Sequence, residues 1–184
     1  MTFTVVLRPQ KLVSCLFFVC LMVSPANPQA AQKQSREGQI SLSMEFPFEH
    51  PVVLNYDARK ALASDPAVAD VMRDEQLSVD TIPKGWFTAS EVHLGSKNQT
   101  DLVVMGRGIS LGPYSAGFWV LRQTPKGYDL VLATQVHHLA LLEPRTNGLR
   151  DIETGLSTLN GSYADRFKFD GQRYQKTPQP QDAR

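Results

Sequence analysis

Residues 118–132, FWVLRQTPKGYDLVL, contain two short apolar runs on either side of a turn. The turn covers residues 123–127 and ends with Gly127. Glycine readily adopts the positive φ angles that tight hairpin turns require. Because apolar runs bounded by turn residues are typical of buried strands, we expect this segment to form an antiparallel hairpin.

Similar apolar runs lie on both sides of this hairpin, separated by glycine, proline, asparagine and lysine. Asp170 and Gly171 lie between two aromatic runs, and an Asp-Gly pair in this setting is a strong hairpin signal. The pattern predicts a mainly antiparallel β-sheet of hairpin meanders over residues 86–174. Further expected strands are residues 91–94, 101–105, 138–142 and 167–169.

The segment before this sheet, residues 40–54, alternates in part between apolar and polar side chains. Alternation is typical of a strand with one buried face. Proline lacks the backbone N–H that a central strand donates, so Pro47 and Pro51 restrict this segment to an edge or irregular strand.

Helical spacing replaces alternation in residues 56–77. Asp65 followed by Pro66 is a helix start signal, since Asp caps the first N–H groups and Pro fits the first turn. We expect short helices over residues 58–63 and 66–75, packed on the sheet. The predicted fold class is therefore α+β.

A faint internal repeat relates the two halves of the predicted sheet. Each unit begins with a polar turn and an Asp before an apolar residue, at Asp101 and at Asp151, and closes with an aromatic strand and a glycine turn. Over residues 92–174 this unit resembles the blade repeats of FG-GAP or VCBS-type extracellular propellers. The chain is also similar to small exported bacterial proteins of unknown function that carry one such sheet.

The resemblance bears on metal binding, because those repeats carry a calcium loop with alternating Asp or Asn residues and a Gly. Residues 147–151 keep part of that loop, but Arg150 stands where a ligand oxygen would be needed. Arginine has no acceptor atom. We therefore expect no metal and no cofactor.

The N-terminal segment has the layout of a secretory signal peptide. Arg8 and Lys11 precede an apolar run over residues 12–23, and small residues and prolines follow it. The run is shorter than the ~20 residues of a bilayer-spanning helix. Cleavage near residue 30 would remove both cysteines of the chain and leave an exported protein, periplasmic or extracellular. Lipidation of Cys15 is a weaker alternative, because this cysteine opens the apolar run instead of following it.

The length and composition are those of one globular domain. The chain has 184 residues, 42% hydrophobic residues and a net charge of +1. This charge is too small to indicate nucleic-acid binding, and we expect no membrane partner after signal cleavage. The expected organisation is a signal peptide, a flexible linker, a single globular domain and a disordered tail over residues 1–30, 31–39, 40–175 and 176–184.

The glycine-rich segment after the strand 101–105 is expected to be a mobile loop that joins two strands, and it is also the first candidate for a binding loop, which we call the predicted binding loop. Glycines allow a partner to approach the backbone closely, and nearby aromatic side chains are typical interface anchors. Phe118 and Trp119 are adjacent on a strand and face opposite sides, so one could lie in the core and the other could be an exposed anchor. The alternative, which the pattern favours, is that both are packed between helix and sheet. The candidate binding residues are Gly106, Arg107, Gly108, Tyr114, Phe118 and Trp119.

Histidines and carboxylates provide the alternative sites. His137 and His138 are adjacent on a strand and face opposite sides, so we do not expect them to share a metal. Glu91 and His93 share a strand face and could act as an acid–base pair, or could belong to a solvated face. Neither pattern identifies a catalytic residue.

The sequence therefore favours an exported non-enzymatic binding or interaction protein whose partner is an unknown protein or small ligand. One alternative is a metal-dependent or acid/base hydrolase that uses Glu91, His93, Asp101 or His137. Another is an inhibitor or immunity-type partner of an exported enzyme.

Overall fold

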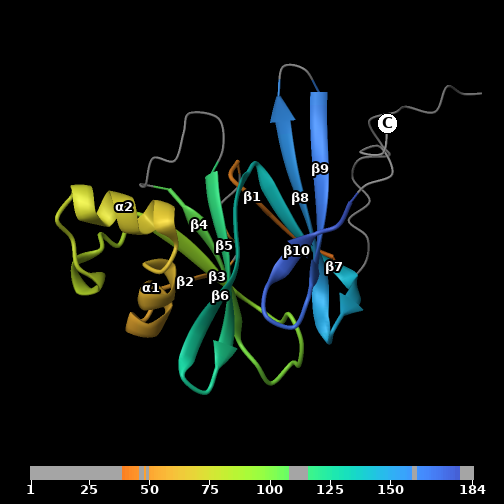
Figure 1. Ribbon diagram of the computed structural model, residues 1–184, viewed down its shortest axis with the longest axis horizontal. Coiled ribbons are helices and arrows are strands. Elements are labelled where there is room, and N and C mark those ends of the chain that lie inside the picture. Colours follow the sequence, from red (N-terminus) through yellow and green to blue (C-terminus); the bar gives the residue numbers. More distant parts are fainter. Residues whose placement is uncertain (1–38, 46–47, 49, 108–115, 159–160, 179–184) are drawn as a thin grey trace, which may run out of the picture. The chain divides into compact units, whose positions relative to one another are not determined.

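Ten strands form two antiparallel sheets in the part of the chain that the computed structural model describes (Figure 1). The expected signal peptide lies outside the described residues, as do most of the expected linker and the end of the expected tail. The structure describes residues 39–45, 48, 50–107, 116–158 and 161–178.

Both sheets have five strands, and each starts with an N-terminal strand at one edge and continues through four strands in chain order. Sheet I contains β2 (Pro51–Val52), β3 (Phe87–Val92), β4 (Asp101–Gly106), β5 (Ala116–Thr124) and β6 (Gly127–Val136), in that order. Sheet II contains β1 (Ile40–Ser43), β7 (His138–Thr146), β8 (Leu149–Thr158), β9 (Gly161–Phe169) and β10 (Tyr174–Lys176), in that order. This confirms the predicted mainly antiparallel α+β fold, with two sheets where the pattern suggested one.

The two sheets share an apolar core. Full burial of a large apolar side chain in this core stabilises the fold by about 1.5–3 kcal/mol. Its fully buried members in β4, β5, β7 and β8 are Val103, Phe118, Val120, Leu139, Leu141 and Ile152, and Leu94 in the loop after β3 is buried to the same extent.

Two helices, α1 (Tyr56–Leu62) and α2 (Pro66–Asp74), cover the other face of sheet I (Figure 1). Asp65 caps α2 as predicted: its Oδ1 accepts hydrogen bonds from the N–H groups of Ala67 (3.1 Å) and Val68 (3.2 Å). A short 3₁₀ helix, η2 (Val79–Thr81), follows. None of these helices is long and apolar enough to span a membrane, within the residues described.

The segment 40–54 divides between the two sheets. β1 pairs only with β7 at the edge of sheet II, and β2 pairs only with β3 at the edge of sheet I. The expected edge position is confirmed. The sequence pattern did not indicate that the two halves of this segment belong to different sheets, because each half is too short to show which partner it has.

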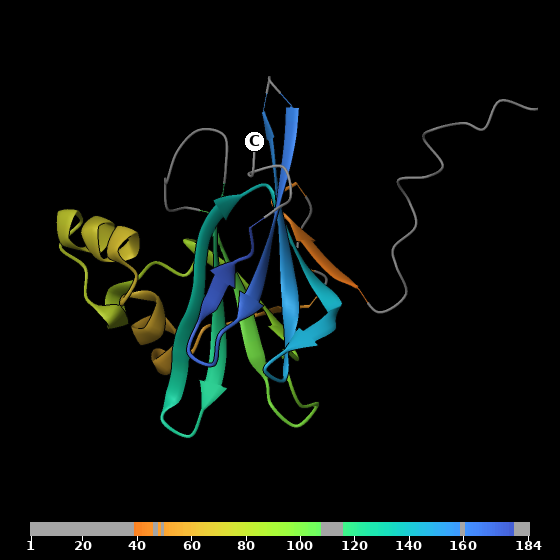
Figure 2. The same ribbon diagram turned by 45° about the vertical axis from the view of Figure 1, so that its right-hand side comes forward.

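Both expected hairpins are present. β5 and β6 are joined at Thr124 and Gly127, which are register partners, and Gly127 has a φ of 115°. β9 and β10 are joined through Asp170 and Gly171, and Gly171 has a φ of 113°. Between β6 and β7 the chain passes from sheet I to sheet II with only His137 between the strands. Figure 2 shows this passage from the teal β6 to the light-blue β7.

Candidate functional site

The predicted binding loop is described only at its beginning. Gly106 is the last residue of β4, and Arg107 is exposed, while its backbone N–H donates to the carbonyl oxygen of Trp86 at 2.7 Å. Gly108 and Tyr114 lie outside the described residues. The described part of the loop therefore brings one cation to the surface but no aromatic side chain.

Phe118 and Trp119 face opposite sides of β5, as predicted, but neither is exposed. Phe118 is 0% exposed in the core between the sheets, and Trp119 is 2% exposed under the helices. The Trp119 ring packs edge-on against Phe87, with 5.4 Å between centroids. Of the two alternatives, packing of both rings is confirmed and an exposed anchor at Phe118 or Trp119 is wrong, because sheet I is covered on both faces.

Asp101 is fully buried and holds the loop before β4 in place. Its Oδ2 accepts from the N–H of Leu94 at 3.0 Å, and its Oδ1 accepts from the N–H of Gln123 at 2.9 Å and from Nε2 of Gln99 at 3.2 Å. Burial raises the pKa of Asp101, and the two backbone hydrogen bonds act in the opposite direction. These contacts give the carboxylate a structural role.

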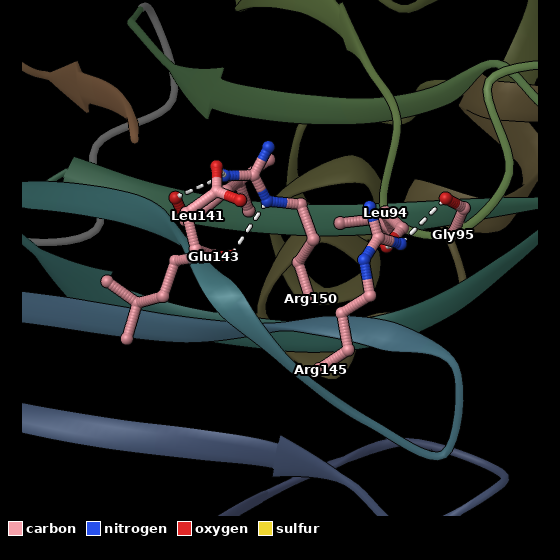
Figure 3. Close-up of polar contacts among 7 residues, drawn as sticks. Leu94, Gly95, Leu141, Glu143, Arg145 and Arg150 are labelled. Atoms are coloured by element: carbon pink, nitrogen blue, oxygen red, sulfur yellow. Dashed lines mark hydrogen bonds and ion pairs between the residues drawn. The ribbon is translucent and has the colours of Figure 1, made fainter. Parts of the chain in front are cut away.

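Arg145 and Arg150, at the β7–β8 hairpin, also make structural contacts (Figure 3). Nη1 of Arg145 donates to the carbonyl oxygens of Gly95 (2.7 Å) and Leu94 (3.0 Å), which follow β3 in sheet I. Nε of Arg150 donates to Leu142 O at 2.8 Å. Figure 3 shows both guanidinium groups directed at backbone carbonyls. The Arg145 side chain ties the hairpin of sheet II to the β3–β4 loop, whereas the Arg150 side chain ties β8 to β7.

Arg150 has a carboxylate partner as well. Its Nη2 lies 3.1 Å from Oε1 of Glu143 and donates to Leu141 O at 3.2 Å (Figure 3). Most of the Glu143 side chain is exposed, whereas the Arg150 side chain is nearly buried. Glu143 therefore lies on the solvent side of the Arg150 guanidinium group and pairs with it there.

The predicted acid–base and histidine candidates do not converge. Glu91 and His93 are both exposed, and His93 lies beyond the end of β3, with its Nδ1 2.8 Å from Gln99 O. His137 accepts from the N–H of Ser157 at 3.1 Å through Nδ1, and the ring of His138 lies over Gly155. Across the described ranges, no three His, Cys, Asp or Glu side chains are placed to hold a metal.

A small pocket opens between β2, α1 and the segment from η2 to β3, and we call it the Arg59/Lys84 pocket. Its volume is about 110 Å³. Val53 stands at its rim with 84% of its surface exposed. The floor and walls are apolar and are formed by Val52, Leu54, Ile82, Pro83 and Phe87.

Two cations also line this pocket. Arg59 projects from α1 and is half-buried, and its Nε is buried without a hydrogen-bond partner. Lys84 is exposed in the segment before β3. In the part of the chain that the structure describes, neither side chain has an ion pair. Sequence reasoning missed both residues, because Arg59 belongs to a predicted helix and Lys84 to a turn, and only tertiary packing brings them to one apolar pocket.

The comparisons with known proteins give no match. No family model, no curated protein and no solved structure matches this chain. The resemblance to FG-GAP or VCBS-type repeats therefore stays a prediction. Pocket geometry is the basis for the function proposed below.

Proposed function

We propose that this chain is an exported, non-enzymatic binding protein and that the Arg59/Lys84 pocket holds a ligand with an anionic head and a short apolar group. The observation that carries the proposal is the combination of apolar walls with two cations that have no carboxylate partner among the described residues. The pocket replaces the glycine-rich loop as the candidate site. Export is supported by the apolar N-terminal segment and the small residues after it.

The unpaired Nε of Arg59 favours an anion. A buried donor without a partner destabilises the protein by about 1–3 kcal/mol, and a hydrogen bond to a charged acceptor offsets this. Arginine stays protonated in proteins and its planar donors match the oxygens of a carboxylate. A carboxylate at the mouth of the pocket would lie beside Lys84 and the Arg59 guanidinium group, and a small rotation of the Arg59 side chain would be needed for the buried Nε to donate to it.

The size of the pocket limits the apolar part of the ligand. An apolar cavity of about 150 Å³ holds a benzene molecule. The 110 Å³ of this pocket therefore accommodates a branched aliphatic group of about four carbons, such as the isobutyl group of leucine. Burial of such a group contributes about 0.8 kcal/mol per methylene.

The hydrolase alternative would use Glu91, His93, Asp101 or His137. Asp101 already accepts three hydrogen bonds, two of them from backbone N–H groups. Glu91 is exposed on β3, and His137 lies at the passage between the sheets. Metal analysis of the purified protein tests this alternative directly, since stoichiometric zinc or calcium would support it. Co-purification from the native host tests an inhibitor or immunity role.

Binding is tested by titrating the purified protein with 4-methylpentanoate and following backbone NMR signals. We expect the acid to shift the signals of Leu54 and Phe87, and the neutral 4-methylpentanamide to shift them much less. Arg59→Gln and Lys84→Gln should weaken the response. Lys60→Gln is the matched control, because Lys60 is an exposed cation on the same helix and does not line the pocket. Equal responses to acid and amide, or no response, would contradict the proposal.

A further inference from the structure

The edge of sheet I runs directly beside the Arg59/Lys84 pocket. β2 is the outermost strand of this sheet, and it pairs with β3 only at Pro51–Ser90 and Val52–Ala89. Val53 and Leu54 continue the chain from β2 to α1 and line the pocket. A ligand in the pocket would therefore lie next to exposed backbone as well as next to apolar side chains.

The backbone of Val53 has no partner within the described residues. No hydrogen bond joins its N–H or its carbonyl oxygen to another described residue, and the residue is 84% exposed. Unpaired backbone groups at a sheet edge are a template for another extended chain. In recognition by strand addition, main-chain hydrogen bonds give affinity and side-chain pockets give specificity.

We infer that the ligand of this pocket is the carboxyl terminus of a peptide bound in extended form along Val53. This inference rests on the proposed function and names its ligand class. The terminal carboxylate lies between Arg59 and Lys84. The last side chain, aliphatic and no larger than leucine, fills the pocket. The preceding residue hydrogen-bonds to the backbone of Val53.

A lipid is the other common source of a carboxylate on an apolar chain, and two observations favour the peptide. The pocket volume of about 110 Å³ accepts one aliphatic side chain and is too small for a long acyl chain. The unpaired backbone of Val53 offers a donor and an acceptor that an acyl chain has no groups to satisfy. A peptide uses both features together.

The first experiment measures binding of the purified protein to two tetrapeptides, acetyl-Ala-Ala-Ala-Leu with a free carboxylate and the same peptide as its amide. We expect the free acid to bind roughly tenfold or more tightly than the amide, because charge-assisted hydrogen bonds to the terminus are lost in the amide. A peptide library with varied last residues should select leucine, valine and isoleucine over glycine, aromatic and charged residues. Lack of selection at this position would overturn the inference.

The second experiment tests the strand pairing. N-methylation of the third alanine, the residue before the last one, removes the N–H that would pair with Val53 and should weaken binding roughly tenfold. The Val53→Pro variant removes the N–H at the sheet edge and should weaken binding of the tetrapeptide more than binding of 4-methylpentanoate, which has no main chain to pair with Val53. The circular dichroism spectrum and the unfolding transition of the variant show whether it is folded. Full peptide affinity after both changes would exclude pairing along Val53.

The outcomes separate this inference from the proposed function. If 4-methylpentanoate binds and the peptides bind no better, the pocket is a small-acid site and the peptide inference is wrong. If hexadecanoate or anionic phospholipid vesicles bind better than the peptides, the ligand is a lipid and the inference is also wrong. If none of these probes binds, both the inference and the proposed function fail.

Discussion

Sheets I and II have the same strand order but different surroundings. Each has an N-terminal edge strand followed by a four-stranded meander, so β4 in one corresponds to β8 in the other and β5 corresponds to β9. The first six residues of β5 are buried, whereas the first four of β9 are exposed. A strand covered on both faces is apolar throughout, and a strand with one solvated face carries polar residues. The pattern of apolar and polar residues in a strand therefore depends more on which faces of its sheet are covered than on the strand order of the sheet.

The repeat in the sequence follows this correspondence. Asp101 begins β4, and Asp151 lies in β8; both are buried and both accept a hydrogen bond from the turn region before their strand. Asp101 accepts three hydrogen bonds, two of them from backbone N–H groups, whereas Asp151 accepts one from Oγ1 of Thr146 at 2.7 Å. The two aspartates at equivalent positions thus differ in the number of backbone N–H groups that they bind: two for Asp101 and none for Asp151 among the described hydrogen bonds.

The largest expected effect comes from the packing of sheet I on both faces, against sheet II on one side and against α1 and α2 on the other. Trp119→Ala should lower the free energy of unfolding by about 3–5 kcal/mol, because it removes a buried ring between β5 and the helices. Tyr163→Ala on β9 should change it by less than about 0.5 kcal/mol, since Tyr163 is 58% exposed. Urea unfolding followed by circular dichroism measures both. Similar losses in the two variants would contradict the difference in cover.

The two acids give the next largest contrast. Asp101→Ala leaves the backbone N–H groups of Leu94 and Gln123 without an acceptor and should destabilise the protein by about 3 kcal/mol. Asp151→Ala leaves only the Thr146 hydroxyl without its acceptor and should cost about 1 kcal/mol. Equilibrium unfolding measures the loss of free energy of unfolding in both variants. A larger loss for Asp151→Ala than for Asp101→Ala would contradict the view that Asp101 binds more of the backbone.

A third variant probes packing within sheet II. A Cβ at Gly155 would fall on the ring of His138, so Gly155→Ala should destabilise the protein by about 1–3 kcal/mol. His138→Ala should relieve this loss, giving a non-additive double-mutant cycle. Gly85→Ala is the control, because nothing lies near its added Cβ. Additive losses at Gly155 and His138 would show that the two residues do not compete for space.

The smallest expected effects are in the pH dependence, where the two sheets should differ in sign. Burial raises the pKa of Asp101 above 3.8, so the folded state binds this proton more tightly than the unfolded state. Its contribution to stability is therefore complete below the unfolded value and lost as the pH rises through the raised value. Hydrogen bonds from the N–H groups of Arg173 and Gln172 lower the pKa of Asp170 in the β9–β10 turn. That contribution is present above the unfolded value and lost as the pH falls.

The measurement compares unfolding free energies of the parent protein, Asp101→Asn and Asp170→Asn over about pH 3 to pH 6. Relative to Asp101→Asn, the parent should lose stability as the pH rises. Relative to Asp170→Asn, it should gain stability over the same range. If the two stability differences changed with pH in the same direction, burial would not be the dominant effect on the pKa of Asp101.

Local features were predictable from the sequence and long-range ones were not. The Asp65 cap and the glycine turns at Gly127 and Gly171 depend on a few adjacent residues, so their signals are complete within a short segment. β8 was missed because Arg150 and Asp151 interrupt its apolar pattern, and only the folded hairpin shows that both are buried.

The candidate site shows the same limit. Alternation placed Phe118 and Trp119 on opposite faces, but it could not show that α1 and α2 cover the second face. Arg59 and Lys84 are far apart in sequence and line the same pocket only because the segment from η2 to β3 lies beside α1. A pocket formed by three separate segments leaves no periodic pattern.

The single residue His137 between β6 and β7 has a mechanical consequence for the molecule. A one-residue passage leaves almost no chain length between the sheets, so sheet II can separate from sheet I only by a change of backbone angles near His137 and by exposing the apolar core that the sheets share. We therefore expect the two sheets to unfold in a single cooperative transition.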